Sequence, residues 1–155
     1  MAKQSAGILA YRRSGKEWRV FLVHPGGPFW AKKDLGAWSI PKGEFADDED
    51  ALAAARREFG EEVGQEVAGE FVELAPRRQK NGKTVHAWAI EGDVDPDKLV
   101  SNEFEMEWPP RSGKMQRFPE VDRGQWFSFA EAKTRLNPGQ IPILEELALL
   151  LEGRS

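Results

Sequence analysis

Apolar and polar residues alternate along the chain in blocks that predict both strands and helices. Two apolar, β-prone runs at residues 5–11 and 18–24 flank the polar segment 12–16, which predicts an antiparallel hairpin. Residues 24–35 are rich in glycine and proline and predict a loop. Residues 38–40 then predict a short strand that leads into Pro41, Lys42 and Gly43.

A helix is predicted over residues 48–63, because apolar side chains recur there at helical spacing. The expected buried stripe consists of Leu52, Ala55, Phe59 and Val63. Four acidic residues lie at the start of this helix, at positions 47–50, where negative charge interacts favourably with the positive end of the helix dipole. Gly64 is positioned to end it.

The second half of the chain predicts further strands and two helices. Strands are expected at residues 70–74, 84–91, 104–108 and 124–127, and Asn81-Gly82 is a strong turn signal. Ser128 and Glu131 form a capping-box pattern at the start of a helix. A closing helix at 141–151 presents an apolar face made of Leu144, Leu147, Ala148 and Leu151. Helices in series with a mixed sheet favour an α/β fold, a layered α/β/α sandwich.

Length and composition predict one domain over residues 1–155. The net charge is −4, so the broad basic field used by nonspecific nucleic-acid binders is absent. No apolar run reaches membrane-spanning length, and the start of the chain has no signal-peptide pattern. Because the chain has no cysteine, disulfides, thiolate metal sites and cysteine nucleophiles are excluded. These features favour a cytoplasmic protein with no membrane partner.

Three glutamates within the first predicted helix are the clearest candidates for chemistry. Glu58, Glu61 and Glu62 stand at positions i, i+3 and i+4, so a helix places their carboxylates on one face. Like charges at this spacing repel one another unless a positive charge lies among them. A hard divalent cation prefers oxygen ligands of this kind. Alternatively, such a charge run forms a solvated helix face held by salt bridges.

The spacing around these glutamates resembles the Nudix box. Residues 43–65 follow the pattern G-x5-E-x7-R-E-U-x-E-E-x-G-U, in which U is a bulky apolar residue, at every position except the last. Gln65 occupies that last position, and Val67 is placed to do its packing instead. The resemblance implies a Nudix-type α/β/α sandwich with a mixed sheet. It also implies a Nudix hydrolase, a pyrophosphatase that uses water to cleave a phosphoanhydride bond in a nucleoside diphosphate linked to another group.

The resemblance further implies roles for the motif residues. Glu58, Glu61 and Glu62 would hold Mg2+, with Mn2+ as the alternative, and the Gly43 carbonyl would complete the ligand set. Glu58 is the first choice for general base, with Glu61 beside it in the catalytic group. Arg57 and Glu49 are eight residues apart, about two helical turns, and would form an ion pair that orients the carboxylates.

Substrate-binding residues are expected outside the helix. The sequence from Trp38 to Gly43 resembles the W-x-x-P-K-G lead-in of Nudix enzymes acting on dinucleoside or diphosphoinositol polyphosphates, where Lys42 would bind a phosphate. Arg111, in a predicted loop with Lys114 and Arg117, could grip outer phosphates. Trp30 could stack on a nucleobase. Each could equally be a surface residue, and Trp88 is expected in the core.

A downstream metal ligand is expected on the segment 103–108. Glu103, Glu105 and Glu107 alternate with apolar residues, so a strand sends the acids to one face. Glu105 is the candidate metal ligand among them, although acids on such a face often meet only water. Glu120 is a further acid that could approach the site.

The expected partner is a small nucleotide rather than long nucleic acid, bound by a monomer or homodimer. A dinucleoside polyphosphate or nucleoside triphosphate is favoured, and ADP-ribose, NADH and diphosphoinositol polyphosphates remain alternatives. A Nudix domain that binds nucleotides without turnover is a further alternative, against which the intact carboxylates argue. Isopentenyl diphosphate isomerisation is disfavoured because the familiar enzymes use a cysteine. Messenger-RNA decapping is disfavoured by the acidic charge.

Overall fold

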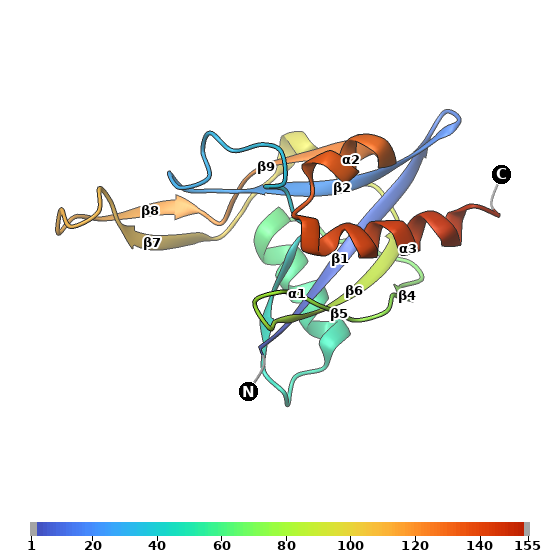
Figure 1. Cartoon of the computed structure of the whole chain (residues 1–155), viewed down its shortest axis with the longest axis horizontal. Coiled ribbons are helices and arrows are strands. Elements are labelled where there is room, and N and C mark those ends of the chain that lie inside the picture. The colour runs from blue at the N-terminus through green and yellow to red at the C-terminus, as the bar shows by residue number, and fades with distance from the viewer. Residues whose placement is uncertain (1–2, 154–155) are drawn as a thin grey trace.

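The computed structural model describes residues 3–153 and contains a central mixed sheet with helices on both faces. The helices and strands, in chain order, are β1 (Gln4–Ser14), β2 (Glu17–Pro25), β3 (Lys42–Phe45), α1 (Ala51–Val63), β4 (Val72–Glu73), β5 (Arg77–Arg78), β6 (Thr84–Glu91), η1 (Pro96–Lys98), β7 (Glu103–Glu107), β8 (Met115–Pro119), β9 (Val121–Ser128), α2 (Phe129–Arg135), η2 (Pro138–Gln140) and α3 (Ile141–Leu151). Figure 1 shows their arrangement.

The strand order of the main sheet is β4-β6-β1-β2-β9, with β3 also paired to β1 and β5 to β6. The central strand β1 runs parallel to β6 over residues 4–11. It is antiparallel to β3 at residues 4–7 and to β2 at residues 11–14. The sheet is therefore mixed. β1 pairs with β3, the strand that precedes α1, the helix with the three glutamates.

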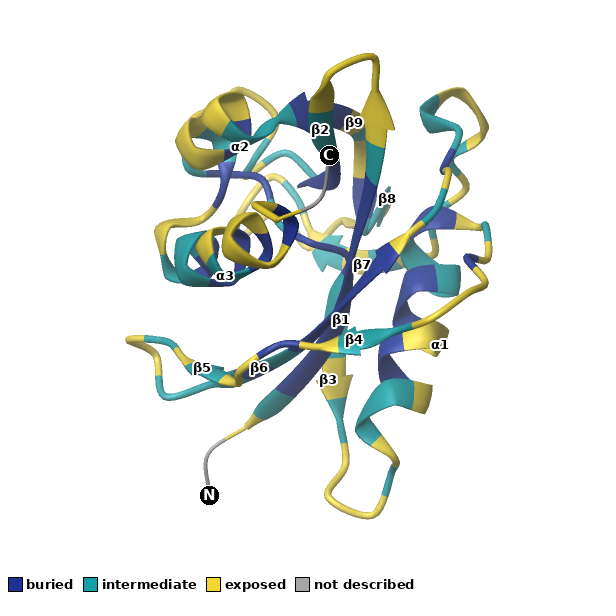
Figure 2. Cartoon of the chain, turned by 90° about the vertical axis from the view of Figure 1, so that its right-hand side faces the viewer, coloured by how far each residue is buried: buried dark blue, intermediate teal, exposed yellow. Residues whose placement is uncertain are grey.

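Apolar residues on both faces of β1 and β2 explain why helices cover both sides of the sheet. Ile8 and Phe21 pack in a cluster with α1, whereas Leu9 and Leu22 pack in a second cluster with α2 and α3. Strand side chains alternate between faces, so an apolar run without polar gaps needs a layer on each side. Figure 2 shows α1 on one side of the sheet and α2 and α3 on the other, which confirms the α/β/α sandwich.

The local signals at the helix ends are confirmed. Gly64 adopts the left-handed conformation (φ 74°) at the end of α1, and its N–H donates to the Gly60 carbonyl. Ser128 and Glu131 form the complete capping box at the start of α2. The closing helix has the predicted bounds, 141–151. Asn81-Gly82 lies at the turn between β5 and β6.

Several expectations are wrong in detail. The acidic run 47–50 precedes α1 rather than occupying its first turn, and Asp50 caps the helix by accepting from the Ala53 N–H. Ala148 is exposed on α3, where Ile143 is buried instead. Residues 38–40 form only isolated bridges, while the strand β3 starts at Lys42.

The segment that contains Arg111, Lys114 and Arg117 is not the continuous loop that was expected. Residues 115–119 form β8, which pairs with β7 in a two-stranded antiparallel sheet. Figure 1 shows this hairpin extending away from the main sheet. Among residues 3–153, no helix is both long and apolar enough to cross a lipid bilayer.

Candidate functional site

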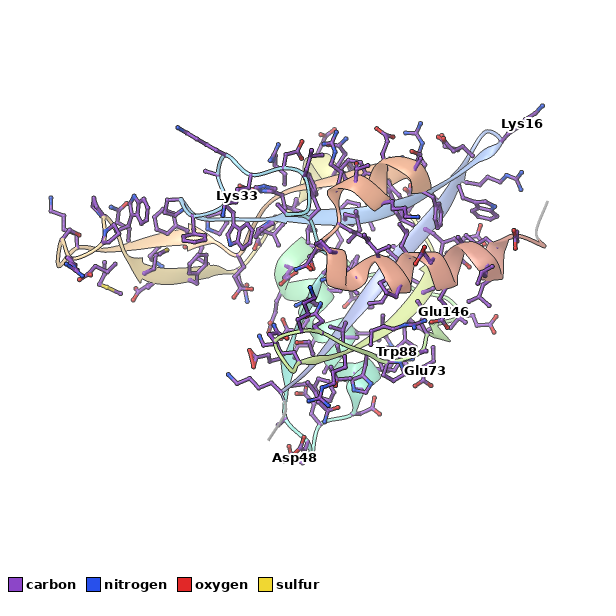
Figure 3. The ribbon with its side chains drawn as sticks, viewed as in Figure 1. Lys16, Lys33, Asp48, Glu73, Trp88 and Glu146 are labelled. Atoms are coloured by element: carbon purple, nitrogen blue, oxygen red, sulfur yellow. The ribbon has the colours of Figure 1, made fainter. Side chains whose placement is uncertain are left out.

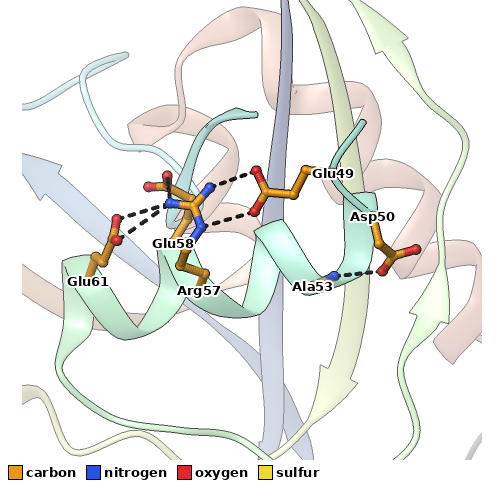
Figure 4. Close-up of polar contacts among 6 residues, drawn as sticks. All are labelled: Glu49, Asp50, Ala53, Arg57, Glu58 and Glu61. Carbon is orange, nitrogen blue, oxygen red and sulfur yellow. Dashed lines mark hydrogen bonds and ion pairs between the residues drawn. The ribbon is translucent and has the colours of Figure 1, made fainter. Parts of the chain in front are cut away.

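Arg57 lies at the centre of the acidic face of α1. Its Nε and Nη2 atoms donate to the two carboxylate oxygens of Glu49 at 3.1 and 3.2 Å. Its Nη1 atom donates to Glu58 at 2.8 Å and to Glu61 at 3.4 Å (Figure 4). The bond to Glu49 is the largest factor that raises the pKa of Arg57. One guanidinium thus contacts three of the four glutamates of the motif.

The Glu58 carboxyl group lies against the α-carbon of Gly43. Glu58 is 8% exposed, and a Cβ atom built on Gly43 would lie 2.0 Å from both the Glu58 Cδ and Oε2 atoms. β3 holds Gly43 in this place by pairing with β1 opposite Ala6. A side chain at position 43 would displace the Glu58 carboxyl group from its present place.

Glu62 and Glu120 form the second half of the acidic site. Burial raises the pKa of Glu62 to about 8, and the nearby charges of Glu120 and Glu58 add to the rise. Burial likewise raises the pKa of Glu58 and of Glu120, with Glu61 adding in each case. Neither Glu62 nor Glu120 forms an ion pair with another residue between positions 3 and 153. Carboxyl groups placed this close together therefore favour the protonated form unless a cation neutralises them.

Lys42 lies beside this acidic group. Its backbone N–H donates to Glu62 Oε1 at 3.3 Å. Burial lowers the pKa of the Lys42 side chain, while the negative charge of Glu62 opposes that change. A half-buried ammonium group at the edge of the carboxylates can contact an anion that approaches them.

The oxygen donors suit a hard divalent cation, although the side chains are not preassembled around one. Within residues 3–153, no three acidic or histidine side chains converge into a ready ligand set. Glu58 and Glu61 instead turn toward Arg57. Several carboxyl groups lie close together here, and the Glu58 carboxyl group reaches the backbone at Gly43, where no side chain intervenes. This arrangement fits a cation with oxygen ligands. Its binding would require Glu58 and Glu61 to turn toward Glu62 and Glu120.

The raised pKa of Glu62 predicts how the stability of metal-free protein depends on pH. Between pH 4.5 and about 8 the folded protein keeps a proton on Glu62 that the unfolded chain has released. The stability that the protonated Glu62 contributes is therefore fully present below this window and is lost as the pH rises through it. In EDTA, we expect the Tm of the wild type to fall relative to that of Glu62→Gln between pH 5 and 8.5. Parallel Tm curves for the two proteins would contradict this expectation.

Two adjoining cavities border the acidic group. The first, here called the central cavity, has a volume of about 230 Å³ and reaches from Glu62 and Glu120 past Lys42 to Asn137 and Gln140. The second, the aromatic cavity, has a volume of about 390 Å³. Its apolar lining includes Phe29, Trp30, Phe104 and Met106. Both cavities share Trp30, Glu62 and Glu120, so they form one continuous cleft beside the carboxylates.

The aromatic cavity is made by close contact between the loop after β2 and the β7–β8 hairpin. A Cβ atom on Gly26 would lie 2.0 Å from the Pro119 carbonyl oxygen, so the loop backbone packs directly on the hairpin. Lys33 Nζ lies 4.7 Å from the centre of the Phe29 ring and 5.0 Å from that of Trp30. Figure 3 shows Lys33 in this region. The aromatic rings of the loop thus line the cavity, and Lys33 packs on them without lining it.

The structure does not bring Glu105 and Arg111 to this cleft. The alternation in β7 is as predicted, but Phe104 and Met106 face the aromatic cavity while Glu105 is exposed and stands opposite Arg117 in β8. Glu120, between β8 and β9, is the downstream acid that lies beside Glu62. Arg111 is exposed in the turn of the hairpin and lines neither cavity.

The remaining expectations concern residues beside the motif. The Gln65 side chain exchanges two hydrogen bonds with the backbone of Asp95, at 2.8 and 2.9 Å, and Val67 is buried in the core. A polar residue is therefore accommodated at the end of the motif. Buried His24 bonds Asp122 and the Lys33 carbonyl, consistent with a local structural role. Trp88, labelled in Figure 3, is 8% exposed and belongs to the core.

Comparison with solved structures finds the same fold in proteins of low sequence identity. The Ap4A hydrolase of C. elegans, in a binary complex, shares 19% identity with a TM-score of 0.64, covering 97% of this chain and 98% of its own. The NUDIX domain of Shewanella oneidensis NrtR, complexed with ADP ribose, shares 17% identity with a TM-score of 0.63, covering 97% and 89%. The E. coli ORF135 protein shares 26% identity with a TM-score of 0.59, covering 99% and 94%.

The comparison with family models identifies the family of this chain. No protein with a curated description matches this sequence. The model described as the NUDIX domain matches residues 1–147, nearly the whole chain. The motif residues, the sandwich and the carboxylate site described above all fall within this match. The chain therefore belongs to the NUDIX domain family, and its solved structural neighbours share its fold.

Proposed function

We propose that this Nudix pyrophosphohydrolase cleaves a phosphoanhydride bond of a dinucleoside polyphosphate or a nucleoside triphosphate, using a divalent metal. The observation that carries the proposal is the pair of Glu62 and Glu120, which form no ion pair within residues 3–153 and lie, close to Glu58, at the wall of a cleft that also has aromatic surfaces. An acidic group of this kind gains a cation readily, and a cation makes the site attractive to polyphosphate.

Glu58, Glu61 and Glu62 would hold Mg2+ or Mn2+, with Glu120 in place of Glu105 as the downstream ligand. When bound, the metal neutralises phosphate oxygens of the substrate and promotes attack by water. Glu58 is our candidate for general base because its buried carboxyl group has a raised pKa and borders Gly43. Arg57, oriented by Glu49, positions Glu58 and Glu61. Lys42 contacts a phosphate at the edge of the site.

Trp30 and the aromatic cavity would receive the nucleobase. Trp30 lines both cavities, so a base that stacks on it lies next to the carboxylates through Glu62. Aromatic side chains bind bases through stacking that tolerates base identity. The substrate would then extend from its base in the aromatic cavity to its diphosphate near Lys42.

The preference among substrates rests on Lys42 and on the relatives. One structural neighbour is an Ap4A hydrolase, which agrees with a dinucleoside polyphosphate. Another is a NUDIX domain complexed with ADP ribose, so ADP-ribose is the second candidate. The half-buried Lys42 ammonium beside the acidic group favours the substrate with more phosphate charge.

The function is tested by a Mg2+-dependent hydrolysis screen with product identification. The substrates are diadenosine tetraphosphate, nucleoside triphosphates, ADP-ribose, NADH and a diphosphoinositol polyphosphate. We expect the highest kcat/KM for diadenosine tetraphosphate or a triphosphate, with complete loss of turnover in EDTA. A higher kcat/KM for ADP-ribose or NADH would contradict the substrate preference.

Removing the aromatic surface tests the placement of the base. We expect Trp30→Ala to raise KM for diadenosine tetraphosphate about tenfold, with a smaller effect on kcat, because stacking on one aromatic side chain is worth about 1–3 kcal/mol. Leu35→Ala is the matched control, since Leu35 is 72% exposed in the same loop and lines neither cavity. Equal KM values for the two variants would count against base binding at Trp30.

A further inference from the structure

A third cavity lies beyond the central one and has no role in the function proposed so far. Its volume is about 430 Å³, and it lies between the β5–β6 turn and η2. The turn contributes Gln79, Lys80 and Asn81, while Asn137 and Gly139 line the other side. No aromatic residue lines it, in contrast to the aromatic cavity.

The side chains of this cavity leave N–H donors unused. The Gln79 Nε2 atom is buried and has no hydrogen-bond partner in the part of the chain described. The Oδ1 atoms of Asn81 and Asn137 accept from the backbone N–H groups of Lys83 (2.9 Å) and Gly139 (3.0 Å). Their amide NH2 groups therefore remain available to a ligand.

Positive charge accompanies these donors. Lys80 is exposed and forms no ion pair with any residue from 3 to 153. A buried donor without a partner costs stability, so a ligand that accepts a hydrogen bond from Gln79 would offset that cost. Two asparagine amide groups and one ammonium group offer donors to this cavity, and the buried amide of Gln79 lies at its wall. A ligand that matches them is rich in acceptors and negatively charged, as a phosphate group is.

The cavity is connected to the proposed catalytic cleft through Asn137. Asn137 lines both this cavity and the central cavity, which contains Lys42 and Glu62. The N–H of Asn137 donates to the Trp38 carbonyl at 2.8 Å, which fixes the backbone at this junction. Thus the aromatic cavity, the carboxylates and the donor-rich cavity follow one another along the cleft.

We propose that the cavity formed by Gln79, Lys80, Asn81 and Asn137 binds the phosphate groups of the substrate that are remote from the stacked nucleobase. This inference rests on the proposed function and deepens it. The far end of the cleft recognises charge rather than a second base, because it offers donors and no aromatic surface. The enzyme therefore favours substrates with several phosphates beyond the scissile bond over ADP-ribose.

The first test measures binding of inorganic tripolyphosphate by titration calorimetry in EDTA, so that no metal contributes. We expect Lys80→Glu to weaken binding at least about tenfold, since it replaces a charged donor with a repelling group. Lys16→Glu is the matched control because Lys16 is an exposed lysine in the β1–β2 turn, shown at the far tip of that hairpin in Figure 3. Equal losses in the two variants, or no binding by the wild type at millimolar tripolyphosphate, would overturn the proposal.

The second test uses Gln79→Met, which removes the unpaired donor while keeping a similar volume. We expect this variant to bind tripolyphosphate more weakly while its Tm stays equal or rises, because an unsatisfied buried group is lost. A purely structural role for Gln79 predicts the opposite, a lower Tm with unchanged binding. That opposite result would contradict the proposal.

Turnover separates this inference from the proposed function. With diadenosine tetraphosphate as substrate, Lys80→Glu should raise KM about tenfold and leave kcat within about twofold, with Lys80→Arg near the wild type. Unchanged KM with normal turnover would refute the phosphate site and leave the hydrolase intact. Tripolyphosphate binding that depends on Lys80, without turnover of any substrate, would support the anion site and refute the proposed function.

Discussion

Replacing Glu58 with glutamine is expected to lower kcat by at least about 100-fold at saturating Mg2+. The substitution keeps the volume of the side chain but removes the charge that could accept a proton or bind the metal. Glu58 is buried between Arg57 and Gly43, so the amide can occupy the same space. The measurement is steady-state kinetics on the best substrate of the screen, with the Tm of the variant as the control for folding.

A kcat near that of the wild type in Glu58→Gln would remove Glu58 from the catalytic role. Glu120 would then be the alternative base, because burial and Glu61 raise its pKa as well. Asp48→Asn is a suitable companion variant, since Asp48 is an exposed acid ahead of the same helix. Figure 3 shows Asp48 at the edge of the molecule, and its replacement should leave kcat unchanged.

The second large effect is expected from Gly43→Ala. A methyl group at this position would lie 2.0 Å from the Glu58 carboxyl group, and the carboxyl group is the flexible end of its side chain. Glu58 must therefore move away while the backbone stays in place. We expect kcat to fall by about 100-fold, close to the loss in Glu58→Gln, with little change in Tm.

Gly60→Ala is the matched control for this experiment. Gly60 lies in α1 within the same motif, and a Cβ atom there would have no neighbour within 4 Å. Alanine in a helix is favoured over glycine by about 1 kcal/mol, so this variant should keep its activity and gain stability. If Gly43→Ala retained wild-type kcat, the contact between Gly43 and Glu58 would have no functional importance.

The sequence was most informative where a signal is local. The glycine at 64 and the capping box at Ser128 each depend on residues a few positions apart, and both appear as predicted in the fold. The Nudix resemblance extended these local signals to the correct α/β/α sandwich. Periodicity also predicted α3 to the residue.

Long-range packing explains what the sequence did not predict. The alternation in β7 showed which side chains share a face, but the packing of Phe104 beside Gly27 in the loop after β2, which places Phe104 rather than Glu105 in the aromatic cavity, is a long-range contact. β8 was missed because its sequence, MQRFP, has no clear alternation. Gln79 and Asn137 line the same cavity although they are 58 positions apart in the sequence, and no local pattern predicts this.

The most direct test of the account is hydrolysis of diadenosine tetraphosphate in water labelled with oxygen-18, followed by mass spectrometry of the products. With Mg2+, we expect one labelled oxygen per cleavage, located in a phosphate of one nucleotide product, because water attacks a phosphorus atom. No product should form in EDTA or with Glu62→Gln. Intact substrate after incubation with Mg2+ and wild-type protein that binds the nucleotide would contradict the account and identify a binding module.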